Sequence, residues 1–196
     1  MKLLYSLAFL LGADNWKLPE LPVEILESLK AFNKEKTQVL DLGCGRGQES
    51  ISLASKGWHV LGVDFIPLAI RQARKAAKTA NVLDRTRFIT ADVSNLSTLE
   101  LPQIQFAYDI GCFHLLDPKQ VEGYIEGVNQ VLESDGLLLL NAFTPRQQGK
   151  KVVGYSLDAV RDLFSPAFEI EKTNDHSYWR FPANWYWLRK VGKRRN

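Results

Sequence analysis

The chain has 196 residues, of which 45% are apolar and 24% are charged, and its 25 basic and 22 acidic side chains give a net charge of +3. These proportions are typical of a globular protein of one domain, and they exclude a disordered tail, a collagen-like chain and a disulfide-stapled mini-protein. Five of the bases lie in the last eight residues, which indicates a solvated basic end rather than a nucleic-acid-binding face.

The cysteines and histidines are few and scattered. The chain has two cysteines, Cys44 and Cys112, and three histidines, and none of them lies in a spacing typical of a zinc or iron–sulfur site. We therefore expect no bound metal. Two cysteines in a chain of this size are typical of a reducing compartment, which favours a cytoplasmic protein.

The N-terminal segment has two interpretations. It begins MKLLYSLAFLLGA, with one lysine, a short apolar run and then small residues, which resembles a secretory signal peptide. The run is too short to span a bilayer as a helix. The alternative is a helix that packs on the domain or makes weak contact with a membrane surface. We expect this helix, with residues 1–17 as a lid or surface element, because the rest of the chain indicates a cytosolic cofactor.

Apolar runs alternate with segments of helical periodicity from residue 38 onward. We expect strands over residues 38–42, 59–63, 87–91, 106–110 and 136–143, and helices over residues 49–56, 67–80, 119–132 and 156–164. Strands that alternate with helices predict an α/β fold with a mainly parallel, doubly wound sheet. Residues 144–154 are expected to form a loop. Residues 168–172 and 185–190 are expected to form an antiparallel pair, because no helix separates them.

The segment VLDLGCGRG joins the first strand to a glycine-rich turn. Gly43, Gly45 and Gly47 stand at alternate positions, where the lack of a side chain lets the backbone turn sharply and approach a ligand. A dinucleotide site usually has the spacing G-x-G-x-x-G, whereas this chain has G-x-G-x-G preceded by Asp41. An acid beside the loop favours the ammonium end of a ligand over a pyrophosphate. The alternative is a purely structural turn.

Acidic side chains also end the following strands. Asp64 lies 21 residues after Gly43, where a doubly wound sheet places an acid that accepts hydrogen bonds from ribose hydroxyls. Its alternative role is a helix N-cap. Asp92 follows the third strand and Asp109 ends the fourth. Because ligands of open α/β sheets bind at the carboxyl ends of the strands, we expect one ligand site at this edge.

Together, VLDLGCGRG, GVDF, ADV and YDIGCFHLL resemble the ordered motifs of class I S-adenosylmethionine-dependent methyltransferases. The segments LLYSLAF and FPANWYWLRK also resemble a group of small bacterial methyltransferases distantly similar to the thiopurine and tellurite-resistance types. The resemblance implies a single-domain, Rossmann-like sheet of seven strands in the order 3-2-1-4-5-7-6 with strand 7 antiparallel. Residues 38–143 would be the cofactor-binding core, and residues 144–196 the acceptor-side loop and closing strands.

The resemblance also implies a role for each motif. The glycines would back the methionine portion of S-adenosylmethionine, the acids would accept from its amino, ribose and adenine groups, and an aromatic ring would lie against adenine. The residues expected to bind this cofactor are Asp41, Gly43, Gly45, Asp64, Phe65, Asp92, Val93 and Gly111. The residues expected to line the acceptor pocket are Cys112, Phe113 and Trp185.

Two side chains at the acceptor end have competing interpretations. His114 follows the fourth strand, where a base could take the acceptor's proton, but it could also be a helix-start residue bonded to the backbone. Trp185 could line the acceptor pocket or pack in the core. In a strand it would share one face with Trp187, and Tyr186 would take the other.

These motifs predict a cytoplasmic methyltransferase that passes the methyl group of S-adenosylmethionine to a small-molecule acceptor and releases S-adenosylhomocysteine. The reaction is an in-line displacement, in which the protein aligns the reactants and excludes water. We expect no nucleic-acid partner, and the oligomeric state stays open. The alternatives are a nicotinamide-dependent oxidoreductase, which the glycine spacing and Asp92 disfavour, and a non-catalytic module that binds an adenosyl ligand.

Overall fold

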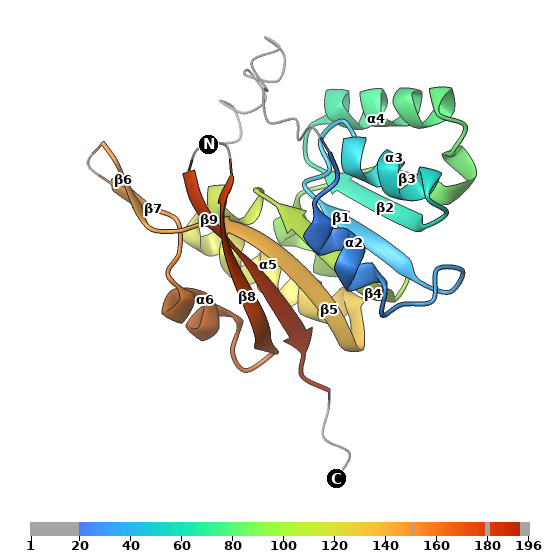
Figure 1. The fold of residues 1–196 in the computed structure, drawn as a ribbon. Helices are drawn as coiled ribbons and strands as arrows, with labels where there is room; N and C mark the ends of the chain where they lie inside the picture. Colours follow the sequence, from blue (N-terminus) through green and yellow to red (C-terminus); the bar gives the residue numbers. More distant parts are fainter. Residues whose placement is uncertain (1–19, 150, 179–180, 193–196) are drawn as a thin grey trace.

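A computed structural model of the chain describes residues 20–149, 151–178 and 181–192 (Figure 1). Its centre is a sheet of seven strands in the order β3-β2-β1-β4-β5-β9-β8. Strand β9 runs antiparallel to both neighbours, and the remaining pairs are parallel, which confirms the predicted topology. The strands are β1 Gln38–Leu42, β2 His59–Asp64, β3 Thr86–Thr90, β4 Ile104–Ile110, β5 Leu132–Phe143, β8 Phe168–Tyr178 and β9 Phe181–Lys190.

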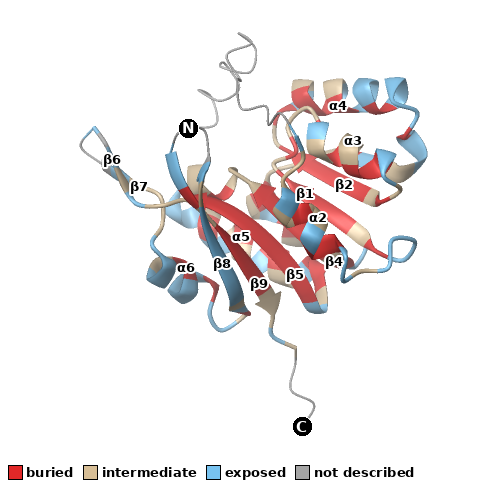
Figure 2. Ribbon diagram, viewed as in Figure 1, coloured by how far each residue is buried: buried red, intermediate tan, exposed pale blue. Residues whose placement is uncertain are grey.

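Helices cover both faces of the sheet (Figure 1). They are α2 Val23–Leu29, α3 Gln48–Ser55, α4 Pro67–Thr79, α5 Pro118–Val131 and α6 Leu157–Phe164, with short 3-10 helices η1 Leu83–Arg85, η2 Val93–Thr98 and η3 Phe113–Leu115. Successive strand residues point to opposite layers. In β5, Leu138 packs in the core that contains Tyr124 of α5, whereas Leu139 packs in the core that contains Ile25 of α2. The central strands are therefore buried on both faces (Figure 2).

The structure departs from the sequence expectation in three places. The predicted loop over residues 144–154 contains a hairpin of β6 Arg146–Gln148 and β7 Lys151–Val153. The two closing strands are longer than expected, because β8 is an edge strand whose exposed polar side chains hide its strand pattern (Figure 2). Helix α2 was not predicted. The proposed lid over residues 1–17 lies outside the described residues.

The aromatic residues of β9 divide between the two cores as their alternation predicts. Trp185 and Trp187 face the α2 side, and Tyr186 faces the α5 side. The Trp187 indole donates a hydrogen bond to Ser28 Oγ of α2 at 2.8 Å. This bond joins the closing strand to the first described helix.

Two glycines of α5 set how closely this helix approaches η2. A Cβ at Gly123 would lie 2.4 Å from the backbone oxygen of Ser94, and a Cβ at Gly127 would lie 2.8 Å from Leu96 Cβ. Any side chain at Gly123 would push the helix away from the 3-10 turn, because a backbone oxygen cannot move aside alone. The glycines therefore fix η2, and with it the preceding residue Asp92, against α5.

Candidate cofactor and acceptor site

The glycine-rich turn after β1 is held in place by its backbone. Gly43, Gly45 and Gly47 have φ values of +77°, +52° and +74°, which residues other than glycine rarely adopt. The amides of Gly43 and Cys44 donate to the Val63 carbonyl at 2.8 and 3.0 Å. A Cβ at Gly45 would meet no atom of the described residues within 4 Å, so these residues leave the outer side of the turn open for a ligand to approach.

The same turn touches the segment that follows β4. A Cβ at Gly43 would lie 2.6 Å from Cys112 Cβ and 2.9 Å from its Sγ. The glycine loop and the turn around Gly111, whose φ is +88°, therefore pack directly against each other. The structure brings these two predicted halves of the site together.

Asp64 joins the end of β2 to the glycine loop. Its Oδ2 accepts a hydrogen bond from the Gly45 amide at 2.9 Å, and its Oδ1 accepts one from the Ile66 amide at 2.8 Å. The side chain is 7% exposed, and burial raises its pKa. The helix N-cap of α4 is Ile66, so Asp64 braces the preceding turn and does not cap the helix.

Asp41 lies in a buried acidic cluster beneath the loop. Its Oδ2 accepts from Ser50 Oγ of α3 at 2.6 Å. Burial, and then the charge of Glu49, raise the pKa of Asp41 to about 8. Burial also raises the pKa of Glu49. A cation at this point would favour the ionised carboxylates, so the cluster suits a ligand with an ammonium group.

Asp92 and Phe65 lie further along the same sheet edge. Asp92 caps η2, and its Oδ1 accepts from the Ser94 amide at 3.1 Å. Its Oδ2 lies 3.5 Å from Gln120 Nε2 of α5. Phe65 is partly buried and packs against Ile66 and Ala69. The acid and the ring are thus placed at neighbouring strand ends, and their role at adenine stays a prediction.

Asp109 is a buried brace for the turn after β4. Its carboxylate accepts from the amides of Cys112 at 2.8 Å and Phe113 at 3.0 Å, and from the Tyr124 hydroxyl at 3.0 Å. Burial raises the pKa of Asp109 to about 7. The side chain has no exposed surface. It therefore holds the turn that carries Gly111 and His114, and it is not available to a ligand.

His114 lies in an aromatic and basic corner, which we call the Arg146 corner: His114, Phe143, Arg146 and Phe181. The His114 ring packs against Phe143 with centroids 3.9 Å apart and planes tilted by 33°. Its Nδ1 is buried without a hydrogen-bond partner among the described residues. Burial and the nearby Arg146 guanidinium lower the pKa of His114 to about 3. The imidazole is therefore neutral at physiological pH and is a weak base.

A second polar group, Asn141, lies on the same face of β5 as Phe143. Asn141 is fully buried, and its amide contacts the His176 imidazole of β8. His176 in turn stacks on Trp185, with centroids 5.6 Å apart and planes 17° apart. Asn141 Oδ1 has no hydrogen-bond partner among the described residues. The sequence analysis missed Asn141, although one polar residue after four leucines in a buried strand is itself a signal.

Three of the predicted site residues point into the cores. Val93 is 5% exposed and packs in the core on the α5 side. Phe113 is fully buried and contacts the rings of Tyr124, Tyr155 and Phe164. Trp185 is 2% exposed and packs on the α2 side. Their assignment to cofactor or acceptor contacts stays a prediction.

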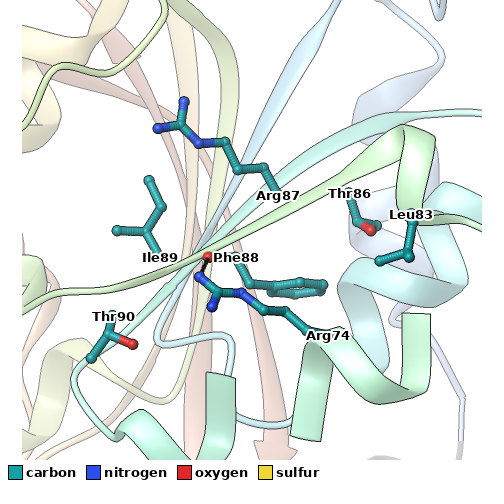
Figure 3. A pocket seen from close by; sticks show the side chains of 7 residues that line it. All are labelled: Arg74, Leu83, Thr86, Arg87, Phe88, Ile89 and Thr90. Carbon is teal, nitrogen blue, oxygen red and sulfur yellow. Dashed lines mark hydrogen bonds between the residues drawn. The ribbon is translucent and has the colours of Figure 1, made fainter. Parts of the chain in front are cut away.

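A cavity of about 460 Å³ runs along β3, the open edge strand of the sheet (Figure 3). Arg74 of α4 reaches over it and donates to the Phe88 carbonyl at 2.6 Å. Its lining contains none of the predicted site residues. We therefore place the functional site at the carboxyl edge, where the motifs converge, and not in this groove.

Two further observations concern metals and membranes. Nowhere in the described ranges do three or more histidine, cysteine or acidic side chains gather in a way that could hold a metal ion. None of the described helices combines the length and the apolar character that crossing a membrane requires.

The sheet is mainly parallel with an antiparallel closing strand, and its glycine loop is bonded to the acid that ends the next strand. These features define the Rossmann-like architecture of class I methyltransferases. The family pattern described as "Methyltransferase domain" matches residues 39–136, which is half of the chain. The chain therefore belongs to the methyltransferase domain family.

Individual relatives agree with this assignment. An uncharacterized methyltransferase of Schizosaccharomyces pombe is 29% identical over 123 residues, which cover 63% of this chain and 83% of the relative. The tRNA 5-carboxymethoxyuridine methyltransferase of Escherichia coli is 30% identical over 172 residues, which cover 84% of this chain and 62% of the relative.

A solved structure shows the same fold. It is the 1,6-didemethyltoxoflavin-N1-methyltransferase of Burkholderia thailandensis, with 1,6-didemethyltoxoflavin and S-adenosylhomocysteine bound. It superposes with a TM-score of 0.76 at 19% identity and covers 95% of this chain and 85% of that chain. The likeness to thiopurine and tellurite-resistance types stays a prediction.

Proposed function

We propose that this chain transfers the methyl group of S-adenosylmethionine to a small-molecule acceptor in the cytoplasm. The observation that carries the proposal is the bond from the Gly45 amide to Asp64, because it joins the two motifs that would hold the cofactor into one cradle. Membership of the methyltransferase family favours this activity over a nicotinamide-dependent oxidoreductase.

The residues present fit the cofactor in charge and in shape. The open turn at Gly45 leaves room for the methionine portion, and the Asp41 cluster faces its ammonium group. Asp64 would accept from the ribose hydroxyls, and Asp92 from the adenine amino group beside Phe65. When bound, S-adenosylmethionine supplies a methyl group on a positively charged sulfur that a nucleophile can displace in line. The chain's own part is to bind, to orient and to exclude water.

The acceptor would enter from the other half of the edge. The Arg146 corner and the Asn141–His176 pair belong to the ends of β4, β5, β8 and β9 and to the hairpin. In this proposal residues 38–143 bind the cofactor, and residues 144–196 shape the acceptor side of a single domain.

Labelled methyl transfer tests the proposal. The protein is incubated with methyl-labelled S-adenosylmethionine and a metabolite extract, and in parallel with total tRNA of the same host. We expect protein-dependent label in a product of low molecular mass. Label in tRNA would replace the small acceptor with a nucleic acid, and cofactor binding without any transfer would favour the non-catalytic module.

The substitution His114→Gln is expected to lower turnover less than about fivefold. A base with a pKa of about 3 is a poor proton acceptor near neutral pH, so general base catalysis, which contributes about 10²–10⁴-fold where it operates, is not expected from this residue. Steady-state kinetics with the identified acceptor gives the result. A 100-fold loss in turnover with intact cofactor affinity would assign His114 as the base.

The affinity for S-adenosylhomocysteine is expected to rise between pH 5.5 and 7.5. Asp41, whose pKa is about 8 without ligand, must lose its proton to face the ammonium. Well below pH 8, each decrease of one pH unit should therefore weaken S-adenosylhomocysteine binding about tenfold. Calorimetry in two buffers of different ionisation enthalpy would show the released proton. The variant Asp41→Asn should lose this slope, whereas the exposed control Asp84→Asn should keep it. A wild type without pH dependence would remove Asp41 from the ammonium site.

A further inference from the structure

The Arg146 guanidinium occupies a corner made by two aromatic rings. Its Cζ lies 3.7 Å from the centroid of Phe181 and 4.7 Å from that of Phe143, and the two rings meet at 73°. Stacking on rings uses the flat faces of a guanidinium and leaves its N–H groups pointing outward in the plane. A guanidinium held by contacts with rings therefore keeps N–H groups for a planar partner that meets it edge to edge.

Within the part of the chain that the structure describes, Arg146 lacks the carboxylate partner that Arg161 and Arg189 have. Arg161 pairs with Asp158 at 2.7 Å, and Arg189 pairs with Glu171 at 2.9 Å. Among the described residues no carboxylate pairs with Arg146, and its buried Nε has no hydrogen-bond partner. A partly buried cation with unused donors is a binding group for an anion.

Charge is divided between the two halves of the site. The cofactor half is acidic, with Asp41, Glu49, Asp64 and Asp92 at or near the strand ends. The acceptor half carries the Arg146 cation, and the neighbouring His114 is neutral. An anionic acceptor would therefore be drawn to Arg146, which fixes its direction of entry.

The rim of the corner is apolar. Phe181 is 40% exposed although it is a large aromatic side chain. An exposed ring beside a cation offers a surface for an apolar body that carries the negative group. Two buried polar atoms add hydrogen-bonding sites: His114 Nδ1 in η3, and Asn141 Oδ1 near the carboxyl end of β5.

We propose that Arg146 anchors the carboxylate of a ring-sized, apolar methyl acceptor, held edge to edge by the guanidinium in the Phe143–Phe181 corner. This inference rests on the proposed function, since it names the acceptor class of the same site. A carboxylate matches the guanidinium fork through two parallel N–H···O bonds, which an amide of equal shape cannot form.

The test uses three probes that share a phenyl ring and differ in their polar group: benzoate, benzamide and phenyl phosphate. Each is added to the full chain saturated with S-adenosylhomocysteine. Titration calorimetry or ligand-observed NMR gives the affinities. We expect benzoate to bind at least about tenfold more tightly than benzamide, a difference of about 1.4 kcal/mol. Tighter binding of phenyl phosphate than of benzoate would overturn the carboxylate assignment, as would equal binding of benzoate and benzamide.

Variants connect the preference to one side chain. Arg146→Met should abolish the preference for benzoate, and Arg146→Lys should retain only part of it, because the charge remains without the fork. Arg161→Met, an exposed arginine on α6, is the matched control and should behave as wild type. A benzoate preference that survives in Arg146→Met would overturn the inference.

The cofactor titration separates the two levels of the proposal. Saturation with S-adenosylhomocysteine is measured first, and its absence would refute the proposed function and the inference together. Normal saturation with no benzoate preference would refute the inference alone. In the methyl-transfer assay, the acceptor should be retained on an anion-exchange resin at pH 7, and transfer to an unretained acceptor would contradict the assignment.

Discussion

Replacing Asp64 with alanine is expected to weaken binding of S-adenosylhomocysteine at least tenfold. The carboxylate would accept from two ribose hydroxyls, and hydrogen bonds to a charged group contribute about 1.5–3 kcal/mol each. A role limited to ribose would leave the stability of the free protein unchanged. However, Asp64 also accepts from the amides of Gly45 and Ile66, so the substitution should lower the unfolding free energy as well.

Two comparisons separate binding from folding in this experiment. Asp92→Ala should weaken binding less, because stacking of adenine on Phe65 would persist. Asp84→Ala, on an exposed residue of η1, should change neither quantity. Calorimetry below the unfolding temperature of each variant gives affinity for the folded fraction. Wild-type affinity in folded Asp64→Ala would remove Asp64 from the ribose site.

Asp109→Ala is expected to lower the unfolding free energy by about 3 kcal/mol or more. The substitution leaves two amides and the Tyr124 hydroxyl buried without their acceptor, and each unsatisfied group costs about 1–3 kcal/mol. Urea unfolding at pH 7 should show a lower midpoint with an unchanged slope. The turn with Gly111 and His114 should loosen with it.

The pH dependence of this effect has a definite sign. The pKa of Asp109 is raised to about 7 in the folded chain, so the stability it contributes is present at low pH and falls as pH rises toward 7. The advantage of wild type over Asp109→Asn should therefore be larger at pH 5 than at pH 8. If Asp109→Ala matched Asp84→Ala in stability at pH 7, the carboxylate would not be the brace of this turn.

The sequence was sufficient for the parallel part of the fold. The strands β1, β2, β4 and the second half of β5 are buried on both faces, so continuous apolar runs such as the four leucines of β5 mark them. The length of the edge strand β8 was underestimated. Its exposed residues, such as Lys172, Asn174 and Asp175, are polar and show no apolar pattern that would mark a strand. The β6–β7 hairpin was missed for a similar reason, since a two-stranded ribbon has little apolar surface of its own.

The site divides in the same way. Local motifs carry the glycine loop, Asp64 and Asp92, because each follows its own strand at a fixed point. The Arg146 corner depends on contacts between residues 114, 143, 146 and 181, which no local pattern links. Likewise, the sequence places Asp109 at the correct edge of the sheet, but its role as a brace depends on Tyr124 of α5, which lies 15 residues later in the chain.

Helix α5 fixes the distance between the two ends of the cofactor cradle, which are the turn at Asp92 and the turn after β4. Gly123 and Gly127 let α5 lie close to η2, and Gln120 contacts Asp92, the N-cap of η2. One helical turn after Gln120, Tyr124 donates to Asp109, which holds the loop after β4. Most of the Arg146 corner comes instead from chain after this helix, from Phe143 to Phe181. In the proposed function, acceptor choice would therefore change through the hairpin and closing strands while the cradle stays the same. For an engineer, this makes residues 143–181 the segment to exchange between relatives when a new acceptor is wanted.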